Sequence, residues 1–246
     1  MISFSTIDRT ENSYVLMLGD HAGRLLPDDV GTLGMAEKDL FDHIAFDPGV
    51  MEALCEWSEN LGVSVVAGRY SRLYVDLNRD PKDPTVISSI SDRRIIPGNV
   101  GLDDAQIKHR LDRAHEPYHQ AVAQFIERIL TKHGYCLILS LHSFTPFWRD
   151  QKRPTEVGLL HASPPSWLYG VETMLREKGF VAGINEPYHG DLPGDCMSRH
   201  AVGRHEHVLI EIRNDLLQDR AWRKTFTGYI DSILSTMQQA RQGEVK

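Results

Sequence analysis

Short apolar runs of strand length alternate along this chain with longer amphipathic stretches, and this order restricts the fold more than any other feature. An apolar run of about four to eight residues is typical of a buried strand, and an apolar face repeated over three turns is typical of a helix. Strands that alternate with helices form a parallel or mixed sheet with helices on both faces. Seven runs fit such strands: residues 14–18, 63–67, 73–77, 136–141, 157–160, 180–184 and 208–212.

Four stretches between these runs predict helices, over residues 48–60, 103–133, 166–178 and 220–242. Pro117 lies inside the longest of them. A proline there removes a backbone donor and clashes with the preceding turn, so we expect a bend or a break. The segment 78–102 is rich in Pro, Asp, Ser and Gly. A loop of that length is usually functional, so we expect it to contribute to a site.

The composition indicates one ordinary globular unit. The chain has 246 residues, of which 41% are hydrophobic, and this is enough for one sizeable core. We therefore expect a single domain over residues 1–246. The net charge is -7 and no run of basic residues could follow a phosphate backbone, so we expect no nucleic-acid partner.

Neither a membrane nor an oxidising compartment is indicated. The first apolar run, residues 14–18, is far too short for a signal sequence or a membrane span, and we expect a cytoplasmic protein with no membrane partner. The three cysteines, Cys55, Cys136 and Cys196, are far apart and odd in number. They predict neither a disulfide framework nor a thiolate zinc site.

Polar side chains follow several of the predicted strands at the point where each strand ends. They lie at residues 20–23, 76–80, 142–144 and 211–213. In an open α/β sheet the ligand cleft lies beyond the carboxyl ends of the strands. Each group alone is also typical of an ordinary loop or surface ion pair. Together they predict a site with imidazoles, carboxylates and guanidinium groups.

One string formally fits the helical zinc motif HExxH, with His115 and His119 as ligands and Glu116 as base. The motif requires an intact helix, because only then do residues four apart share a face. Pro117 disturbs that geometry, so we expect these histidines to pack or cap instead. A zincin-type peptidase that uses His115, Glu116 and His119 remains an alternative.

Several stretches resemble the N-formylglutamate amidohydrolase family, which is related to zinc carboxypeptidases and aspartoacylases. These stretches, spread over residues 13 to 235, are "DHAGRLLP", "HIAFDPG", "RYSRLYVDLNRDP", "PGNVGL", "LSLHSFTP", "NEPY" and "IEIRNDLL". The resemblance implies a carboxypeptidase-like (zinc exopeptidase-like) fold, a three-layer α/β/α sandwich around a mixed, twisted sheet. It also implies metal-dependent hydrolysis of a small N-acyl amino acid, with N-formyl-L-glutamate giving formate and L-glutamate.

The resemblance also implies one divalent metal ion, with zinc expected. His21 and His142 match the two histidine ligands of the wider group. That group has a glutamate three residues after the first histidine, but this chain has Arg24, a permanent cation that cannot bind a metal. Asp47 is the expected third ligand and Asp20 the alternative. Asp47 could equally cap the helix predicted to begin at Pro48.

The substrate's free carboxylate is expected at Asn78 and Arg79, which match the Asn-Arg pair that holds this group in the relatives. A guanidinium group offers a carboxylate two parallel donors, and an amide adds another. Arg72 and Arg213 are candidate cations for a second carboxylate. Either arginine could instead form an ion pair, with Asp76 or Asp215.

Glu211 matches the general base at the end of a strand in the wider group, where a carboxylate takes a proton from water and passes it to the leaving amine. The expected partner is thus a small molecule. The missing glutamate at Arg24 leaves open a non-catalytic binding protein on the same fold. The oligomeric state stays open.

Overall fold

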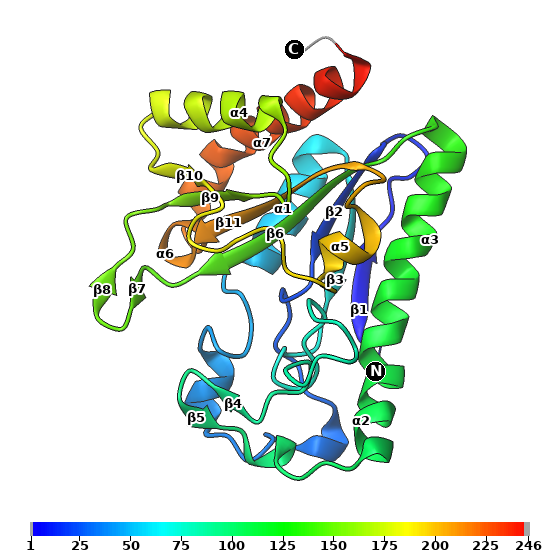
Figure 1. Ribbon diagram of the computed structural model, residues 1–246, viewed down its shortest axis with the longest axis vertical. Coiled ribbons are helices and arrows are strands. Elements are labelled where there is room, and N and C mark those ends of the chain that lie inside the picture. The colour runs from blue at the N-terminus through cyan, green and yellow to red at the C-terminus, as the bar shows by residue number, and fades with distance from the viewer. Residues whose placement is uncertain (1, 244–246) are drawn as a thin grey trace.

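A seven-stranded mixed sheet forms the middle of the molecule (Figure 1). The computed structural model describes residues 2–243, so residue 1 and residues 244–246 of the expected domain lie outside the described residues. The strand order is β1-β3-β2-β6-β11-β9-β10. The bounds are β1 (Phe4–Ile7), β2 (Val15–Gly19), β3 (Ser64–Gly68), β6 (Leu137–Phe144), β9 (Val157–Leu160), β10 (Ala182–Ile184) and β11 (Glu206–Arg213).

The four central strands are parallel and the outer ones are not. β2 pairs in parallel with both β3 and β6, and β6 pairs in parallel with β11. β1 runs antiparallel to β3, and β9 runs antiparallel to β11. The expected mixed sheet is confirmed, and its central parallel part carries the buried strands that the apolar runs predicted.

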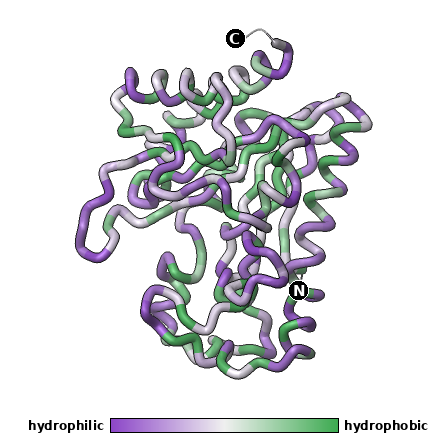
Figure 2. The backbone as a smooth tube through the Cα atoms, in the orientation of Figure 1, coloured by the Kyte–Doolittle hydropathy of each residue, from purple (hydrophilic) through white to green (hydrophobic). Residues whose placement is uncertain are grey.

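Helices cover both faces of the sheet, which confirms the three-layer α/β/α arrangement (Figure 1). One core contains Trp57, Leu168 and Phe226, from α1 (Val50–Leu61), α4 (Ser166–Glu177) and α7 (Arg220–Gln242). The other core contains Tyr118 and Val122 of α3 (Glu116–His133), which packs on the opposite face. Along the backbone, hydrophobic colour is concentrated in the central strands (Figure 2).

The longest predicted helix is three consecutive helical pieces. α2 (Asp104–Arg110) begins at Asp103, whose side chain accepts from the Gln106 N–H in a capping box. A π-helical turn, η4 (Leu111–His115), then leads into α3. The wider turn comes just before Pro117, where the carbonyl of an α-helical turn would meet the proline ring. The expected disturbance therefore takes the form of a π-turn, and the helical path continues.

One predicted strand is wrong. Residues 73–77 form turns, in which the Tyr74 N–H donates to the Ser71 carbonyl at 2.9 Å. Leu73, Val75 and Leu77 are nevertheless buried in the core beside α3. An apolar run reports burial but not backbone shape, so a buried loop gave the same pattern as a strand.

Several short elements were not predicted from the sequence. They are β1, the hairpins β4 (Ile90–Ser91) with β5 (Arg94–Ile95) and β7 (Phe147–Trp148) with β8 (Gln151–Lys152), the helices α5 (Cys196–His200) and α6 (Asn214–Leu217), and the 3-10 turns η1 (Asp28–Val30), η2 (Glu37–Phe41) and η3 (Pro97–Asn99). Short elements carry too little periodicity to be recognised. Within residues 2–243, no helix is long and apolar enough to cross a membrane.

Candidate active site

Three neighbouring parallel strands bring His21, His142 and Glu211 to one end of the sheet. His21 follows β2, while His142 lies in β6 and Glu211 in β11, both a little before the strand ends. In the register of β6 and β11, Glu211 is directly opposite His142. Alternate residues of a strand face the same side, and this places both side chains on the face that α3 covers.

A cavity of about 630 Å³ opens over these side chains. The loop that contains Arg72, Asn78 and Arg79 and a segment before α5 complete its walls. We call the latter the wall segment (residues 187–195). The described residues that line the cavity include His21, Asp47, Arg72, Asn78, Arg79, His142, Ser143, Leu160, Leu209, Glu211 and seven residues of the wall segment.

His21, Asp47 and His142 form a buried group that could hold a metal ion, and we call it the cavity triad. The Asp47 Oδ2 atom lies 3.0 Å from His142 Nδ1 and 3.7 Å from His21 Nδ1. The two imidazole rings are 5.0 Å apart between centroids and nearly perpendicular. Two imidazoles and one carboxylate form a ligand set typical of catalytic zinc, which leaves a coordination position open.

Two further carboxylates orient the histidines of the cavity triad from behind. The Asp76 Oδ1 atom is 2.6 Å from His21 Nε2, and the Asp20 Oδ2 atom is 3.2 Å from His142 Nε2. With a proton on each Nε2, both Nδ1 atoms face the triad. Histidines that bind metals almost always donate their other N–H in this way. Asp20 therefore supports His142 from the far side, and does not face the triad beside His21.

The surroundings of the His21 Nδ1 atom best test whether a cation fits here. It is buried and has no hydrogen-bond partner in the described structure. An unpaired buried nitrogen of this kind is costly and calls for a ligand. Because Asp47 and His142 Nδ1 lie beside it, the donor set fits a divalent ion bound by these three residues.

Asp47 is not the cap of the following helix. The helix begins at Val50, two residues later than Pro48, and its N-cap position is Gly49, with no side-chain cap. The Asp47 carboxylate instead accepts from the Ser143 N–H at 3.2 Å and contacts His142. Of the two roles that the sequence left open, the structure places this side chain in the triad.

The carboxylates of this region are held ionised. Burial would raise the pKa of Asp20, but the hydrogen bond with His142 and its charge outweigh burial and lower it to about 2. Burial would likewise lower the pKa of His142, but Asp20 and Asp47 raise it well above its usual range. The negative charge around the two imidazoles makes this end of the sheet attractive to a cation.

At Glu211, burial outweighs the effect of the neighbouring positive charges. Burial raises the pKa of this carboxyl group to about 7, and its Oε2 atom is buried without a hydrogen-bond partner. A carboxylate with a pKa near 7 is suited to take a proton and to give it back at neutral pH. Its place in the cavity beside the triad is the one expected of a general base.

Asn78, Arg79 and Arg72 also line the cavity, as predicted from the sequence. The Asn78 Oδ1 atom accepts from the Cys196 N–H at 2.8 Å. Arg72 donates to the Asp76 carboxylate at 2.8 Å and lies 3.6 Å from Asp47. The cavity therefore combines a negatively charged triad with two guanidinium groups, which suits an anionic ligand that also reaches a cation.

The residues of this site lie within a segment that matches a known protein family. The family model of N-formylglutamate amidohydrolase matches residues 13–218, which is most of the chain and includes every residue of the cavity triad. The chain belongs to the N-formylglutamate amidohydrolase family.

Two curated relatives match shorter parts of this family member. An N-formylglutamate deformylase from Pseudomonas aeruginosa is 31% identical over 100 residues, covering 37% of this chain and 38% of the relative. One from Pseudomonas putida is 30% identical over 115 residues, covering 41% of this chain and 43% of the relative. The matched segments thus span less than half of either relative.

Solved structures resemble this family member over nearly its whole length. A gene product from Agrobacterium tumefaciens is 28% identical with a TM-score of 0.89, covering 98% of this chain and 97% of that chain. An N-formylglutamate amidohydrolase from Ralstonia eutropha is 23% identical with a TM-score of 0.72, covering 99% of this chain and 100% of that chain. The second likeness supports the fold alone.

Arg213 was expected to bind substrate, but it is not among the described residues that line the cavity. Its guanidinium group donates to Asp215 at 2.8 Å and lies 3.7 Å from Glu156. The side chain is two residues beyond Glu211 at the end of β11, where an acidic neighbour on α6 holds it. The ion pair with Asp215 considered from the sequence is the arrangement found.

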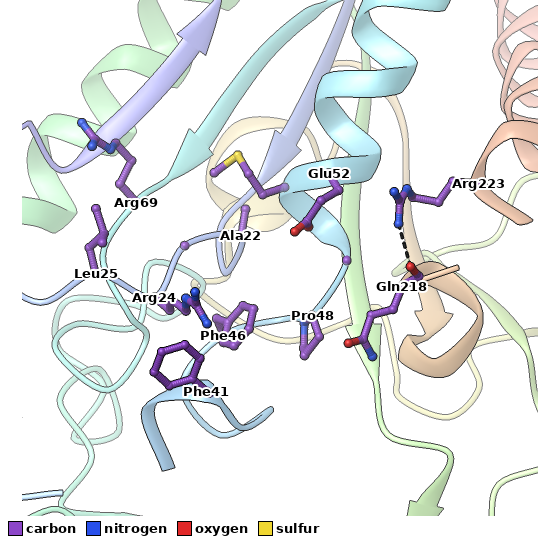
Figure 3. A pocket seen from close by; sticks show the side chains of 13 residues that line it. Ala22, Arg24, Leu25, Phe41, Phe46, Pro48, Glu52, Arg69, Gln218 and Arg223 are labelled. Atoms are coloured by element: carbon purple, nitrogen blue, oxygen red, sulfur yellow. Dashed lines mark hydrogen bonds between the residues drawn. The ribbon is translucent and has the colours of Figure 1, made fainter. Parts of the chain in front are cut away.

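Arg24, which stands where the wider group has a metal-binding glutamate, points into a separate cavity (Figure 3). Its guanidinium carbon lies 4.0 Å from the centroid of the Phe41 ring and 5.6 Å from that of Phe46. An arginine over aromatic rings forms a favourable cation–π contact. Arg24 thus lies away from the triad, in which Asp47 is the carboxylate.

The HExxH string does not form a metal site of its own in residues 2–243. Neither His115 nor Glu116 belongs to a group that could hold an ion. The His115 Nε2–H donates to the Arg79 carbonyl at 2.9 Å, and the exposed Glu116 lies 3.4 Å from Arg199. His119 does belong to such a group, but its neighbours there come from α5.

Some functional candidates were missed in the sequence. Asp76 was expected near the site within residues 76–80 and as an ion-pair partner of an arginine, but its contact with His21 was not predicted. Tyr188, in the "NEPY" stretch, lines the cavity, and its hydroxyl accepts from Arg153 at 3.1 Å. The quoted "NEPY" stretch was the available signal for Tyr188, whereas the contact of Asp76 is only visible in three dimensions.

Proposed function

We propose that this chain is a metal-dependent amidohydrolase that cleaves a small N-acyl amino acid, N-formyl-L-glutamate, to formate and L-glutamate. The observation that carries the proposal is the buried, unpartnered Nδ1 atom of His21, which faces Asp47 and His142 at the edge of a cavity. The family and the names of the two relatives support the same substrate class.

His21, Asp47 and His142 would hold one divalent ion, and their nitrogen and carboxylate ligands favour zinc. When bound, the ion supplies a Lewis acid that polarises the substrate carbonyl and makes water a stronger acid. Asp76 and Asp20 keep the two imidazoles in the tautomer that presents Nδ1 to the triad.

Glu211 is the proposed base. Its carboxylate takes a proton from the attacking water, whose oxygen forms the new bond to the formyl carbon. The same proton then passes to the nitrogen of the leaving amine as the C–N bond breaks. Water is consumed, and formate and the amino acid are the only products. A pKa raised by burial to about 7 suits both proton transfers.

Arg79 and Asn78 are proposed to bind the α-carboxylate of the substrate. Both line the cavity that contains Glu211. Arg72 lies on the same cavity, and its guanidinium group has more donors than the contact with Asp76 uses. We therefore propose Arg72 for the second carboxylate of the substrate, and we leave Arg213 out of the binding site.

The direct test is to incubate the purified chain with N-formyl-L-glutamate while formate, free amine and bound metal are measured. We expect equal amounts of formate and amine, and a bound divalent ion. His142→Ala should lose the ion and the activity together. His109→Ala is the matched control, because His109 is exposed on α2 and does not line the cavity.

Two results would contradict the proposal in different ways. A chain that binds the ion and the substrate but releases no formate would be the non-catalytic binding protein. A chain that binds no divalent ion, and in which His142→Ala behaves as wild type, would remove the metal site itself.

A further inference from the structure

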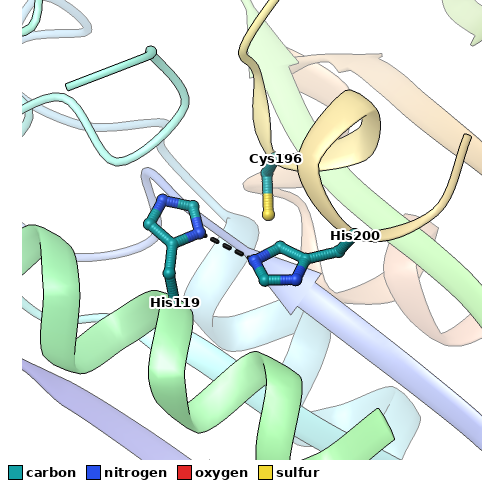
Figure 4. A group of neighbouring side chains, drawn as sticks. All are labelled: His119, Cys196 and His200. Carbon is teal, nitrogen blue, oxygen red and sulfur yellow. Dashed lines mark hydrogen bonds between the residues drawn. The ribbon is translucent and has the colours of Figure 1, made fainter. Parts of the chain in front are cut away.

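A second group of potential metal ligands lies behind the cavity, on the face of the sheet that α3 covers. His119 comes from α3, and Cys196 and His200 come from α5. One ligand atom from each residue lies within 4.8 Å of the other two, and all three residues are buried. Figure 4 shows the sulfur of Cys196 and the two imidazole rings directed toward one another.

The hydrogen bonds of His119 fix which of its nitrogens faces this group. Its Nε2 atom lies 3.0 Å from the Leu77 carbonyl, which can only accept, so the proton is on Nε2. Its Nδ1 atom therefore carries no proton. This atom lies 2.9 Å from His200 Nε2 and accepts a hydrogen bond from it. A histidine that donates to a backbone carbonyl with one nitrogen and presents the other is the usual arrangement at a metal.

A metal ligand binds through an unprotonated nitrogen, and the tautomer of His119 presents one to this group. The buried thiol of Cys196 adds a soft sulfur ligand to the two nitrogens. The Cys196 sulfur and the two imidazoles together form a group of three potential ligands, which the pair of histidines alone would not provide.

We propose that His119, Cys196 and His200 form a second metal site, separate from the cavity triad, for a thiophilic divalent cation of the zinc type. The ion would replace the proton that His200 now shares with His119, and it would bind Cys196 as the thiolate. Two imidazoles and one thiolate form a known zinc ligand set that leaves a fourth position for water.

The site would hold one side of the substrate cavity in place. Cys196 directly follows the wall segment, and its N–H donates to Asn78 Oδ1 at 2.8 Å. A cation bound between α3 and α5 would thus connect the wall segment and Asn78 to a long helix that packs on the sheet. This role stands whether or not the proposed reaction is right, since it concerns binding of the ion alone.

Cobalt titration separates the two sites, because only the second contains sulfur. The full chain is dialysed against a chelator and titrated with Co²⁺, while bound cobalt and near-ultraviolet absorption are measured. We expect two ions per chain and a thiolate-to-cobalt charge-transfer band. Cys196→Ser should lose the band and one ion. His142→Ala should lose the other ion and keep the band.

Cys55→Ser and Cys136→Ser are the matched controls, one at an exposed cysteine and one at a buried cysteine elsewhere. Both should keep two ions and the band. Wild-type protein without a band at saturating Co²⁺ would overturn the proposal, even if Cys196→Ser fails to fold. So would a band that survives in Cys196→Ser, or one that disappears in His142→Ala.

Discussion

Two groups of histidines lie on the same face of the sheet, and their surroundings make them chemically different. In the cavity triad, carboxylates face both imidazoles, with Asp47 between the rings and Asp20 and Asp76 behind them. In the group formed by His119, Cys196 and His200, the close partners are a carbonyl, a thiol and another imidazole.

The protonation of the two groups differs accordingly. The pKa of His142 is raised well above its usual range, since Asp20 and Asp47 overcome the effect of burial. The pKa of His119 falls to about 2, because burial acts there with little opposition. Burial alone therefore does not decide the charge of a histidine, and the nearest carboxylate does. The cavity triad thus concentrates charge, whereas burial keeps His119 of the other group neutral.

The largest effect on activity should come from Glu211→Gln, at the cavity triad's side of this contrast. The glutamine keeps nearly the same shape but cannot accept a proton, so we expect kcat to fall by roughly 10² to 10⁴. Bound metal should be unchanged, because Glu211 is not in the cavity triad. Formate release under saturating substrate, with metal analysis of the same sample, measures both. A variant that loses the ion would show that Glu211 is a ligand instead.

The stability of the same variant provides an internal check. The pKa of Glu211 rises from 4.5 to about 7 on burial, so the folded wild type loses stability as the pH rises between these values. A glutamine at this position does not titrate, so the variant does not lose this stability as the pH rises. Chelator-treated Glu211→Gln should therefore unfold at higher denaturant concentration than wild type above pH 7, with the difference fading toward pH 4.5. Equal stability of the variant and the wild type at pH 8 would mean that burial does not raise the pKa of Glu211.

A smaller effect is expected at Arg79, which we propose to bind the substrate's α-carboxylate. Arg79→Ala should raise KM about tenfold to a hundredfold, the value of one or two charged hydrogen bonds. Arg79→Lys should recover only part of this, because an ammonium group cannot reproduce two parallel donors. The matched comparison is an N-formyl amine without the α-carboxylate, for which wild type and Arg79→Ala should be equally poor. If wild type hydrolyses that compound well, Arg79 has another role.

Much of the fold and of the site could be predicted from the sequence because the signals there are local. Strands at β2, β3, β6 and β11 follow from apolar runs, and side chains at the strand ends follow from the geometry of parallel sheets. That reasoning, with the family resemblance, placed His21, His142 and Glu211 in one cavity. It also predicted that Arg24 is not a ligand, and the structure places Arg24 over the Phe41 ring.

The rest depends on contacts between distant residues. Asp47 does not cap α1 because the helix begins at Val50, and the sequence pattern could not fix the start of the helix within two residues. Arg213 lies outside the described lining of the cavity, and Asp215, two residues away, holds it in an ion pair. Cys196 looked isolated in the sequence, since its partner His119 is on a helix that lies far away along the chain.

The smallest effect on activity should come from substitutions in the HExxH string. They test whether the histidines outside the cavity triad take part in the reaction. His115 and His119 contact the carbonyls of Arg79 and Leu77, not the cavity triad. We therefore expect His115→Ala to keep the ion of the triad and to lower kcat/KM by less than about tenfold. His119→Ala should also keep that ion, while it loses the thiolate-to-cobalt band and about 1 to 3 kcal/mol of stability. Metal analysis and denaturant unfolding of both variants decide the matter, with His21→Ala as the reference. If His115→Ala loses the ion on which activity depends and His21→Ala does not, the HExxH string binds that ion and the chain would be a zincin, because a metal can serve the reaction only where its ligands meet the substrate.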